Sequence, residues 1–178
     1  LKTKDLLNEA GHTLAVRTWM GDSLLPAARN VLLGYFHKEK EFTDFIFVDH
    51  DVWWNGDELL RLLKHPVDFV GGSYRYKSED ENYPMGWEEE AEGKGLTAVD
   101  PLTGEPSWDG LLKVNQVPGG FVRLTRAAVD KLFAAYPERY YAARHAPDVL
   151  CCALYEVPFV PGVGIGFYGS CWSGAGTA

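Results

Sequence analysis

Apolar residues in this chain fall into short continuous runs that alternate with amphipathic stretches. The continuous runs have the length and apolar content of buried strands, and they cover residues 43–48, 67–72 and 121–124. The amphipathic stretches repeat apolar residues at helical spacing, and they cover residues 24–36, 59–63 and 126–136. This alternation of strand and helix predicts an α/β fold with a mostly parallel sheet and helices on both faces.

Local signals predict where several elements begin. Ser23 is a candidate N-cap for the helix that follows it. Asn55 and Glu58 have the spacing of a capping box, so a helix is expected to start directly after Asn55. Thr125 is expected to cap the next helix in the same way, and residues 13–18 predict one further strand.

The regular alternation stops over a long excursion at about residues 78–109. This stretch is polar, acidic and rich in glycine and proline, with a possible hairpin signal at 94–99. Long excursions of this kind in a compact domain usually form lids or substrate loops. We therefore expect this segment to lie beside a binding site.

Size and charge narrow the class of protein. The 178 residues suit one domain spanning 1–178, and the 46% hydrophobic content is that of a globular protein. A net charge of −8 with no block of Lys or Arg argues against a nucleic-acid partner. No apolar run has the length of a membrane span, and the three cysteines form no CxxC pair, so a cytoplasmic protein is expected.

The strongest candidate for chemistry is the pair Asp49 and Asp51, which directly follows the strand at 43–48. Residues two apart in an extended segment point to the same side, so both carboxylates can face one ligand. Ligands of open α/β sheets bind at the carboxyl ends of strands. Two carboxylates at such an end predict a site for a hard divalent cation.

Four segments, in the same order, resemble motifs of the GT-A glycosyltransferases, and most closely the family-2-like enzymes of bacteria and phages. The D-x-D strand is matched at 45–51, and the three further matches are an A-R-N helix segment at 28–30, a v-x-G-x-Y-x-x-K segment at 70–77 and a G-x-G-F-x-x-x-x-R segment at 118–126. The resemblance implies a GT-A-like, Rossmann-like fold. It also implies a metal-dependent transferase that moves a sugar from a nucleotide-sugar donor to a carbohydrate or other hydroxyl acceptor.

The same resemblance implies roles for individual residues. Asp51 would hold the Mn²⁺ or Mg²⁺ ion that bridges the donor diphosphate, and Asp49 would lie near the donor ribose or in the metal shell. The remaining residues would contact the donor: Arg29 and Asn30 would reach the nucleotide or the D-x-D loop, Lys77 a phosphate, and Gly119 and Gly120 would let the backbone approach the sugar closely.

The chain departs from the family pattern at both ends, which makes it resemble a truncated member. The strand that normally opens the family is missing, as are the later acidic pair and the His that can bind the metal. Asp109 and Asp148 are then the candidates for a catalytic base. Among the tryptophans near the expected cleft, Trp87 and Trp108 are the better candidates for acceptor contacts.

Two other functions remain open. A strand followed by D-x-D also opens haloacid-dehalogenase-type phosphohydrolases, in which the first Asp would be the nucleophile, but the later motifs of that class are not found in this sequence. The second alternative is a non-catalytic remnant domain that folds without turning over substrate.

Overall fold

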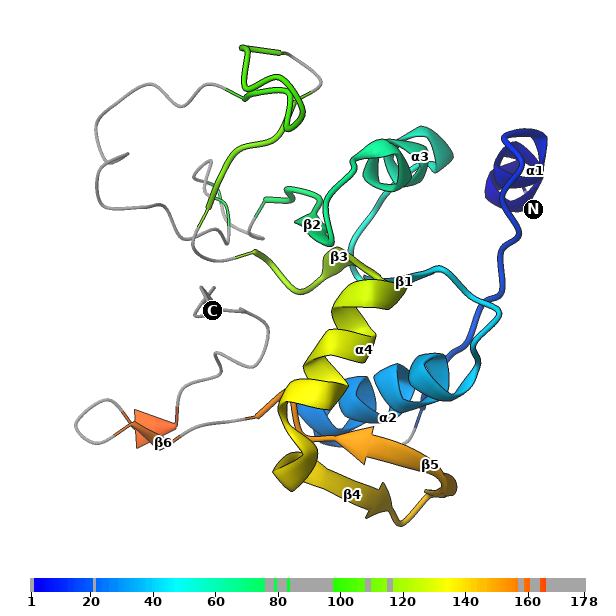
Figure 1. Ribbon diagram of the computed structural model, residues 1–178, viewed down its shortest axis with the longest axis vertical. Helices are drawn as coiled ribbons and strands as arrows, with labels where there is room; N and C mark the ends of the chain where they lie inside the picture. Colours follow the sequence, from blue (N-terminus) through cyan, green and yellow to red (C-terminus); the bar gives the residue numbers. More distant parts are fainter. Residues whose placement is uncertain are drawn as a thin grey trace.

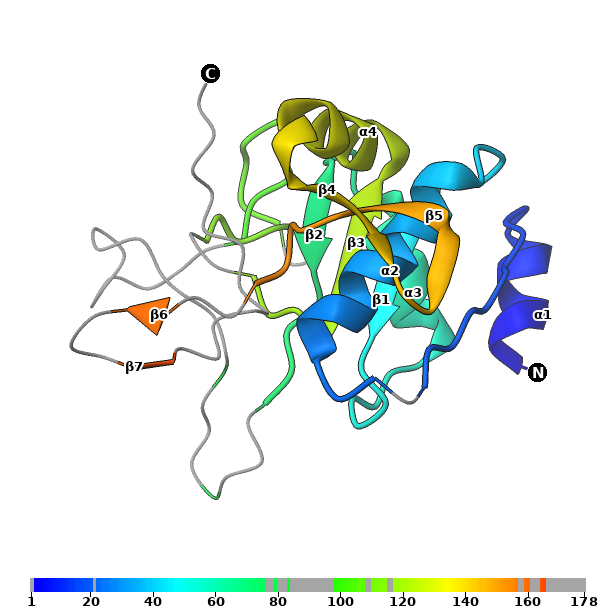
Figure 2. The same ribbon diagram turned by 90° about the horizontal axis from the view of Figure 1, so that it is seen from below.

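The computed structural model describes residues 2–20, 22–75, 79, 83, 98–107, 110–114 and 117–156, and the backbone alone of 159–160 and 164–165. Figures 1 and 2 show the arrangement of its elements from two directions. The helices are α1 (Lys2–Glu9), α2 (Leu25–Lys38), α3 (Gly56–Lys64) and α4 (Arg126–Ala135), followed by the short 3₁₀ helix η2 (Pro137–Arg139). The strands are β1 (Asp44–Val48), β2 (Phe69–Gly71), β3 (Phe121–Thr125), β4 (Tyr140–Ala143), β5 (Ala146–Cys152), β6 (Phe159–Val160) and β7 (Gly164–Ile165).

The central sheet has the strand order β1-β3-β2, and β3 is antiparallel to both neighbours. The other two sheets are antiparallel hairpins, β4 with β5 and β6 with β7. The expectation of a mostly parallel, Rossmann-like sheet is therefore wrong: the fold is mixed α/β with small antiparallel sheets.

The direction of β3 has a topological cause. A helix that follows a strand can carry the chain back across the sheet, so that the next strand starts at the same edge as the first and runs parallel to it. Helix α3 joins β1 to β2 in this way, and the two strands run in the same direction. No helix joins β2 to β3 in the described part of the long excursion after Gly71. The chain re-enters at the edge where it left, so β3 runs in the opposite direction.

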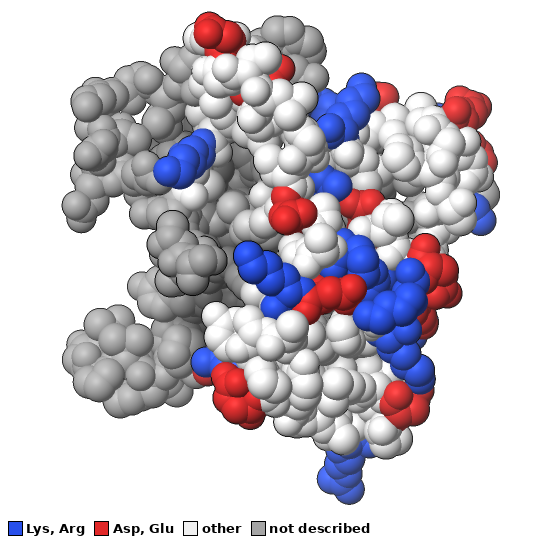
Figure 3. Space-filling model, viewed as in Figure 1, with Lys and Arg blue, Asp and Glu red and all other residues white. Residues whose placement is uncertain are grey.

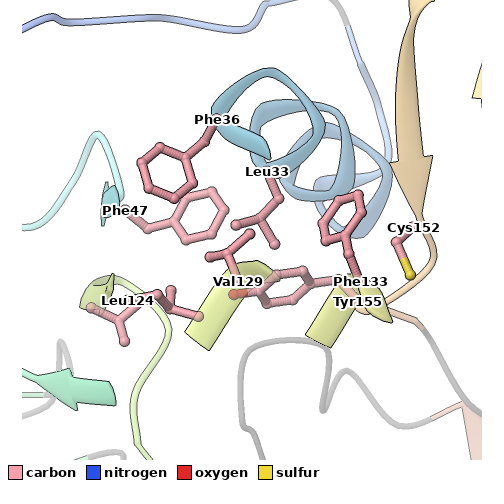
Figure 4. Close-up of a cluster of buried hydrophobic side chains, with 9 residues drawn as sticks. Leu33, Phe36, Phe47, Leu124, Val129, Phe133, Cys152 and Tyr155 are labelled. Atoms are coloured by element: carbon pink, nitrogen blue, oxygen red, sulfur yellow. The ribbon is translucent and has the colours of Figure 1, made fainter. Parts of the chain in front are cut away.

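Helices cover both faces of this sheet. On one face α2 and α4 pack against the side chains of Phe47, Val122 and Leu124 (Figure 4). On the other face α1 and α3 pack against Val70 and Phe121. The alternation of inward and outward side chains along each strand therefore places apolar residues in two core layers, as a strand buried on both faces requires.

The hairpin β4–β5 packs on the side of α2 that faces away from the central sheet (Figure 2). Val31 of α2 is buried there with Val149 and Cys151 of β5. The contact is close at Gly34, where an added Cβ would stand 2.6 Å from Val149 Cγ1 and 2.7 Å from the carbonyl oxygen of Leu150. The hairpin, which the sequence pattern does not predict, thus fixes α2 from its outer side.

Of the three predicted helix caps, two are confirmed and one is wrong. The capping box at Asn55 and Glu58 is confirmed, with N–H···O distances of 3.0 and 2.8 Å, and Thr125 caps α4 by accepting from Ala128 N–H. The Ser23 cap is wrong, because α2 starts after Leu24 and has no side-chain cap. The strand at 13–18 is also wrong, since this segment pairs with no other strand among the described residues.

None of the described helices combines the length and the apolar content that crossing a membrane would require.

Candidate functional site

The candidate site lies at the edge where β1 and β2 end and β3 begins. Asp49 follows the last residue of β1, and its N–H donates to the carbonyl oxygen of Gly120 at 2.8 Å. Gly72 follows the last residue of β2, and its N–H donates to the carbonyl oxygen of Phe121 at 2.9 Å. The antiparallel course of β3 therefore brings the glycine turn at 119–120 to the same edge as the D-x-D segment.

Arg29 of α2 reaches this edge and binds Asp49. Its Nη2 donates to Oδ1 and Oδ2 of Asp49 at 2.9 and 3.0 Å. The two partners differ in exposure, because the side chain of Arg29 is 2% exposed and that of Asp49 is 30% exposed. A guanidinium stays charged in proteins, so Asp49 serves as the counter-ion of a buried cation.

The rest of the Arg29 side chain lies among aromatic rings. Its Cζ stands 5.4 Å from the centre of the Phe47 ring and 5.5 Å from that of Tyr155. Nε and Nη1 are buried and have no hydrogen-bond partner among the described residues. These contacts hold the guanidinium in place, and Asp49 is therefore held at the end of β1.

Gly120 lies where there is no space for a side chain. A Cβ on this residue would stand 2.5 Å from the Tyr74 hydroxyl oxygen and 3.1 Å from Oδ2 of Asp49. The N–H of Gly120 itself donates to the Tyr74 hydroxyl at 3.1 Å. Glycine at this position lets a hydroxyl, a carboxylate and the backbone converge. The close approach of a sugar or acceptor to the glycine pair stays a prediction. Tyr74 is a site residue that the sequence interpretation did not single out.

Asn30 has a different position from its neighbour. Its Oδ1 accepts from Leu154 N–H and Tyr155 N–H at 3.1 and 2.9 Å, and its Nδ2 donates to the Tyr155 carbonyl at 2.9 Å. The Tyr141 hydroxyl bonds Asn30 as well, and burial raises the pKa of Tyr141. Asn30 thus joins α2 to the segment after β5, and its amide is directed away from Asp49.

Asp51 is exposed, two residues beyond Asp49. Within the described ranges, no group of three or more His, Cys, Asp or Glu side chains is placed to hold a metal ion. A closed cage of protein ligands is therefore not formed by this part of the chain. The donor set suits Mg²⁺ or Mn²⁺ held through one carboxylate together with phosphate oxygens and water, the arrangement usual at phosphate-binding sites.

One other predicted residue does not join this group. Asp148 lies on β5, where its carboxylate accepts from Lys38 Nζ at 2.7 Å, and this bond to a cation lowers the pKa of Asp148. Lys38 stands nine residues after Arg29 on α2, roughly 13 Å along the helix axis. Lys77 and Asp109, like Trp87 and Trp108, lie outside the described residues.

Two more buried arginine contacts are structural. Arg123 of β3 is 7% exposed; its guanidinium binds Asp44 at 2.7 Å and donates to three carbonyl groups at and after the end of α3. Arg126, the last residue of the fourth motif, donates to the carbonyl groups of Phe36, Glu39 and Phe42. Both satisfy carbonyl groups that a helix end leaves without partners, so neither serves the candidate site.

Acidic and basic side chains lie side by side on the face shown in Figure 3. On the described surface between α2 and α4, Asp130 accepts from His37 at 2.8 Å and from Lys40 at 3.0 Å. Burial and the charge of Lys40 lower the pKa of His37 below 6.5. Burial acts to raise the pKa of Asp130, but its bonds to Lys40 and His37 bring it below the ordinary value. This cluster joins the C-terminal end of α2 to α4, and it contains no residue of the D-x-D segment.

Comparisons with known proteins assign no family. No family model and no curated protein matches this chain. Among solved structures, A197 from STIV is similar over 88% of each chain, with 15% sequence identity and a TM-score of 0.36.

Proposed function

We propose that this chain binds a nucleotide-sugar donor together with Mn²⁺ or Mg²⁺ and transfers the sugar to a hydroxyl acceptor. The observation that carries the proposal is the buried Arg29, which binds Asp49 at the end of β1, beside Gly120. The resemblance to GT-A glycosyltransferases in four motifs suggested this activity, and residues of all four motifs, Arg29, Asp49, Tyr74 and Gly120, have contacts at this edge.

The charges at the strand end suit a diphosphate with a bound cation. Arg29 neutralises Asp49, and the resemblance to GT-A glycosyltransferases gives the metal ion to Asp51, which is exposed at the same strand end. Because the protein has a net charge of −8, an anionic donor needs such a local positive centre. A bound Mn²⁺ or Mg²⁺ would offset the charge that develops on the leaving nucleoside diphosphate.

The chain's own residues have separate roles in this proposal. Arg29 is a positioning residue that fixes the orientation of Asp49. Asp49 then offers its exposed side to a donor hydroxyl, while Asp51 holds the cation. At Gly120 the Tyr74 hydroxyl and the Asp49 carboxylate leave no room for a side chain, so backbone alone would face the donor there.

The phosphohydrolase alternative is less well supported. Its nucleophile would be Asp49, and both oxygens of Asp49 accept from Arg29 Nη2. Hydrogen bonds to the charged form of a carboxylate stabilise that form and make it a weaker nucleophile. The non-catalytic alternative predicts that neither nucleotide nor metal binds to the folded protein.

Calorimetry tests the proposal directly. Mn²⁺ with UDP, GDP, ADP or CDP is titrated into the wild type, into Asp51→Ala and into Asp5→Ala, which removes an exposed carboxylate from α1. We expect at least one nucleoside diphosphate to bind the wild type in the presence of Mn²⁺. Asp51→Ala should weaken that binding by about tenfold or more, which corresponds to 1.4 kcal/mol, and Asp5→Ala should leave it unchanged. Binding that is equal in all three proteins, or absent in all three, would contradict the proposal.

A further inference from the structure

Trp53 is the most unusual surface residue near the candidate site. It is 84% exposed, although a tryptophan gains more from burial than any other side chain. It follows Asp51 by two residues on the loop between β1 and α3. An exposed side chain of this size beside the candidate site is available for contact with a ligand, and tryptophan is enriched among the residues that carry most of the binding energy at interfaces.

The loop holds Trp53 in this outward orientation. Its two neighbours, Val52 and Trp54, pack into the core layer beneath α1 and α3, and the Trp54 ring stacks on Phe121 with centroids 6.1 Å apart. Because side chains alternate along extended backbone, burial of Val52 and Trp54 directs Trp53 to the opposite side, toward solvent.

Both ends of this loop are fixed as well. Val52 N–H donates to the Asp49 carbonyl at 3.1 Å, and Asn55 caps α3. The Trp53 ring therefore needs little ordering when a ligand binds, and a tryptophan has only two rotatable bonds to fix.

We propose that Trp53 is a platform for the acceptor, and that it stacks on the face of a neutral sugar ring. The inference rests on the proposed transferase function and names the acceptor class. The indole face carries negative charge density, and the C–H groups on one face of a pyranose carry partial positive charge, so the two attract. The same negative charge density disfavours an anionic ring over the indole face, and a sugar also carries the hydroxyl group that the proposed transfer requires. The sequence interpretation favoured Trp87 and Trp108 for this role.

A binding experiment without donor or metal tests the platform. The ¹⁵N-labelled protein is first screened on an array of neutral oligosaccharides, and the bound glycan is titrated while the six tryptophan indole N–H signals are followed by NMR. The variant Trp53→Phe identifies the Trp53 signal and preserves an aromatic face, and Trp53→Ala removes it. We expect the Trp53 signal to shift, Trp53→Ala to weaken binding about tenfold or more, and Trp53→Phe to retain most of the affinity.

The contrary results are also defined. If no neutral glycan binds the folded wild type, or if Trp53→Ala binds as well as the wild type, the platform is wrong. If UDP or GDP alone shifts the Trp53 signal and no glycan does, the ring contacts the donor base and the acceptor assignment falls. The transferase proposal fails separately: glycan binding through Trp53 with no nucleotide binding would leave the platform intact and remove the donor site.

Discussion

At the scale of single residues, Arg29 explains most about the candidate site. A guanidinium that is 2% exposed is costly to bury, and the cost is offset by Asp49 and by the rings of Phe47 and Tyr155. Two of its nitrogens have no hydrogen-bond partner among the described residues, so folding alone does not use the full bonding capacity of this side chain. A charge kept under these conditions points to a role at the strand end beyond packing.

Substitution of Arg29 should therefore cost more stability than substitution of an exposed arginine. Arg29→Ala removes the buried cation, leaves a void and leaves Asp49 without its counter-ion. We expect the free energy of unfolding in urea to fall by about 2 kcal/mol or more. Arg17→Ala is the matched control, because Arg17 binds Glu39 at 2.5 Å with a side chain that is 45% exposed, and such pairs contribute at most about 1 kcal/mol. Equal losses would show that the buried pair has no special weight.

His37 should contribute a pH dependence to stability. Burial, aided by Lys40, lowers its pKa in the folded protein, so the unfolded chain takes up a proton at a higher pH than the folded one. The free energy of unfolding should therefore decrease as the pH falls below about 6.5, the ordinary pKa of histidine. His37→Gln keeps a hydrogen-bonding group near Asp130 and does not titrate, so its stability should fall less between pH 7 and pH 5.5. An identical pH profile for the two proteins in urea denaturation would contradict this assignment.

At the scale of elements, the strand and the helix on either side of the D-x-D segment could be predicted, but the direction of β3 could not. The apolar run before Asp49 predicted β1, and the capping box predicted α3, because both depend on local chemistry. The direction of β3 depends on how the chain returns from its long excursion, and no local pattern records that. Because β3 is antiparallel and lies between β1 and β2, it begins at the edge of the sheet where those two strands end. In a parallel sheet Gly120, at the start of β3, would lie at the opposite edge, so its contact with Asp49 depends on the antiparallel direction.

The packing of α2 on β5 gives an element-scale prediction. In an exposed helix, Gly→Ala stabilises by about 1 kcal/mol, because alanine has the higher helix propensity. At Gly34, the added Cβ would stand 2.7 Å from the Leu150 carbonyl oxygen, which belongs to backbone and cannot easily move. We expect the steric term to exceed the propensity term, so that Gly34→Ala lowers the melting temperature, with a cost of about 1–3 kcal/mol. Ala127→Gly, on the exposed side of α4, measures the propensity effect alone, and a stabilised Gly34→Ala would refute the close packing.

At the scale of the whole molecule, α2 is the element that joins the parts. It packs on the central sheet through Leu33 and Phe36, and on the hairpin β4–β5 through Val31 and Gly34. The hairpin escaped prediction because its residues 140–152 mix small, charged and apolar side chains, with several exposed positions. Two layers that hold one helix fix the position of Arg29, and so of Asp49.

The central claim is that the D-x-D edge, and no other part of the molecule, takes up the metal with a nucleotide. Paramagnetic broadening by Mn²⁺ measures this most directly, since amide signals nearest the ion broaden first. With substoichiometric Mn²⁺ and a bound nucleoside diphosphate, the account predicts early loss of the amide signals of Asp49, Asp51 and Gly120. The signals of the hairpin β4–β5 around Asp148 should persist, and Asp51→Ala should abolish the selective loss. Broadening that begins at Asp148, or that is unchanged by Asp51→Ala, would contradict the account.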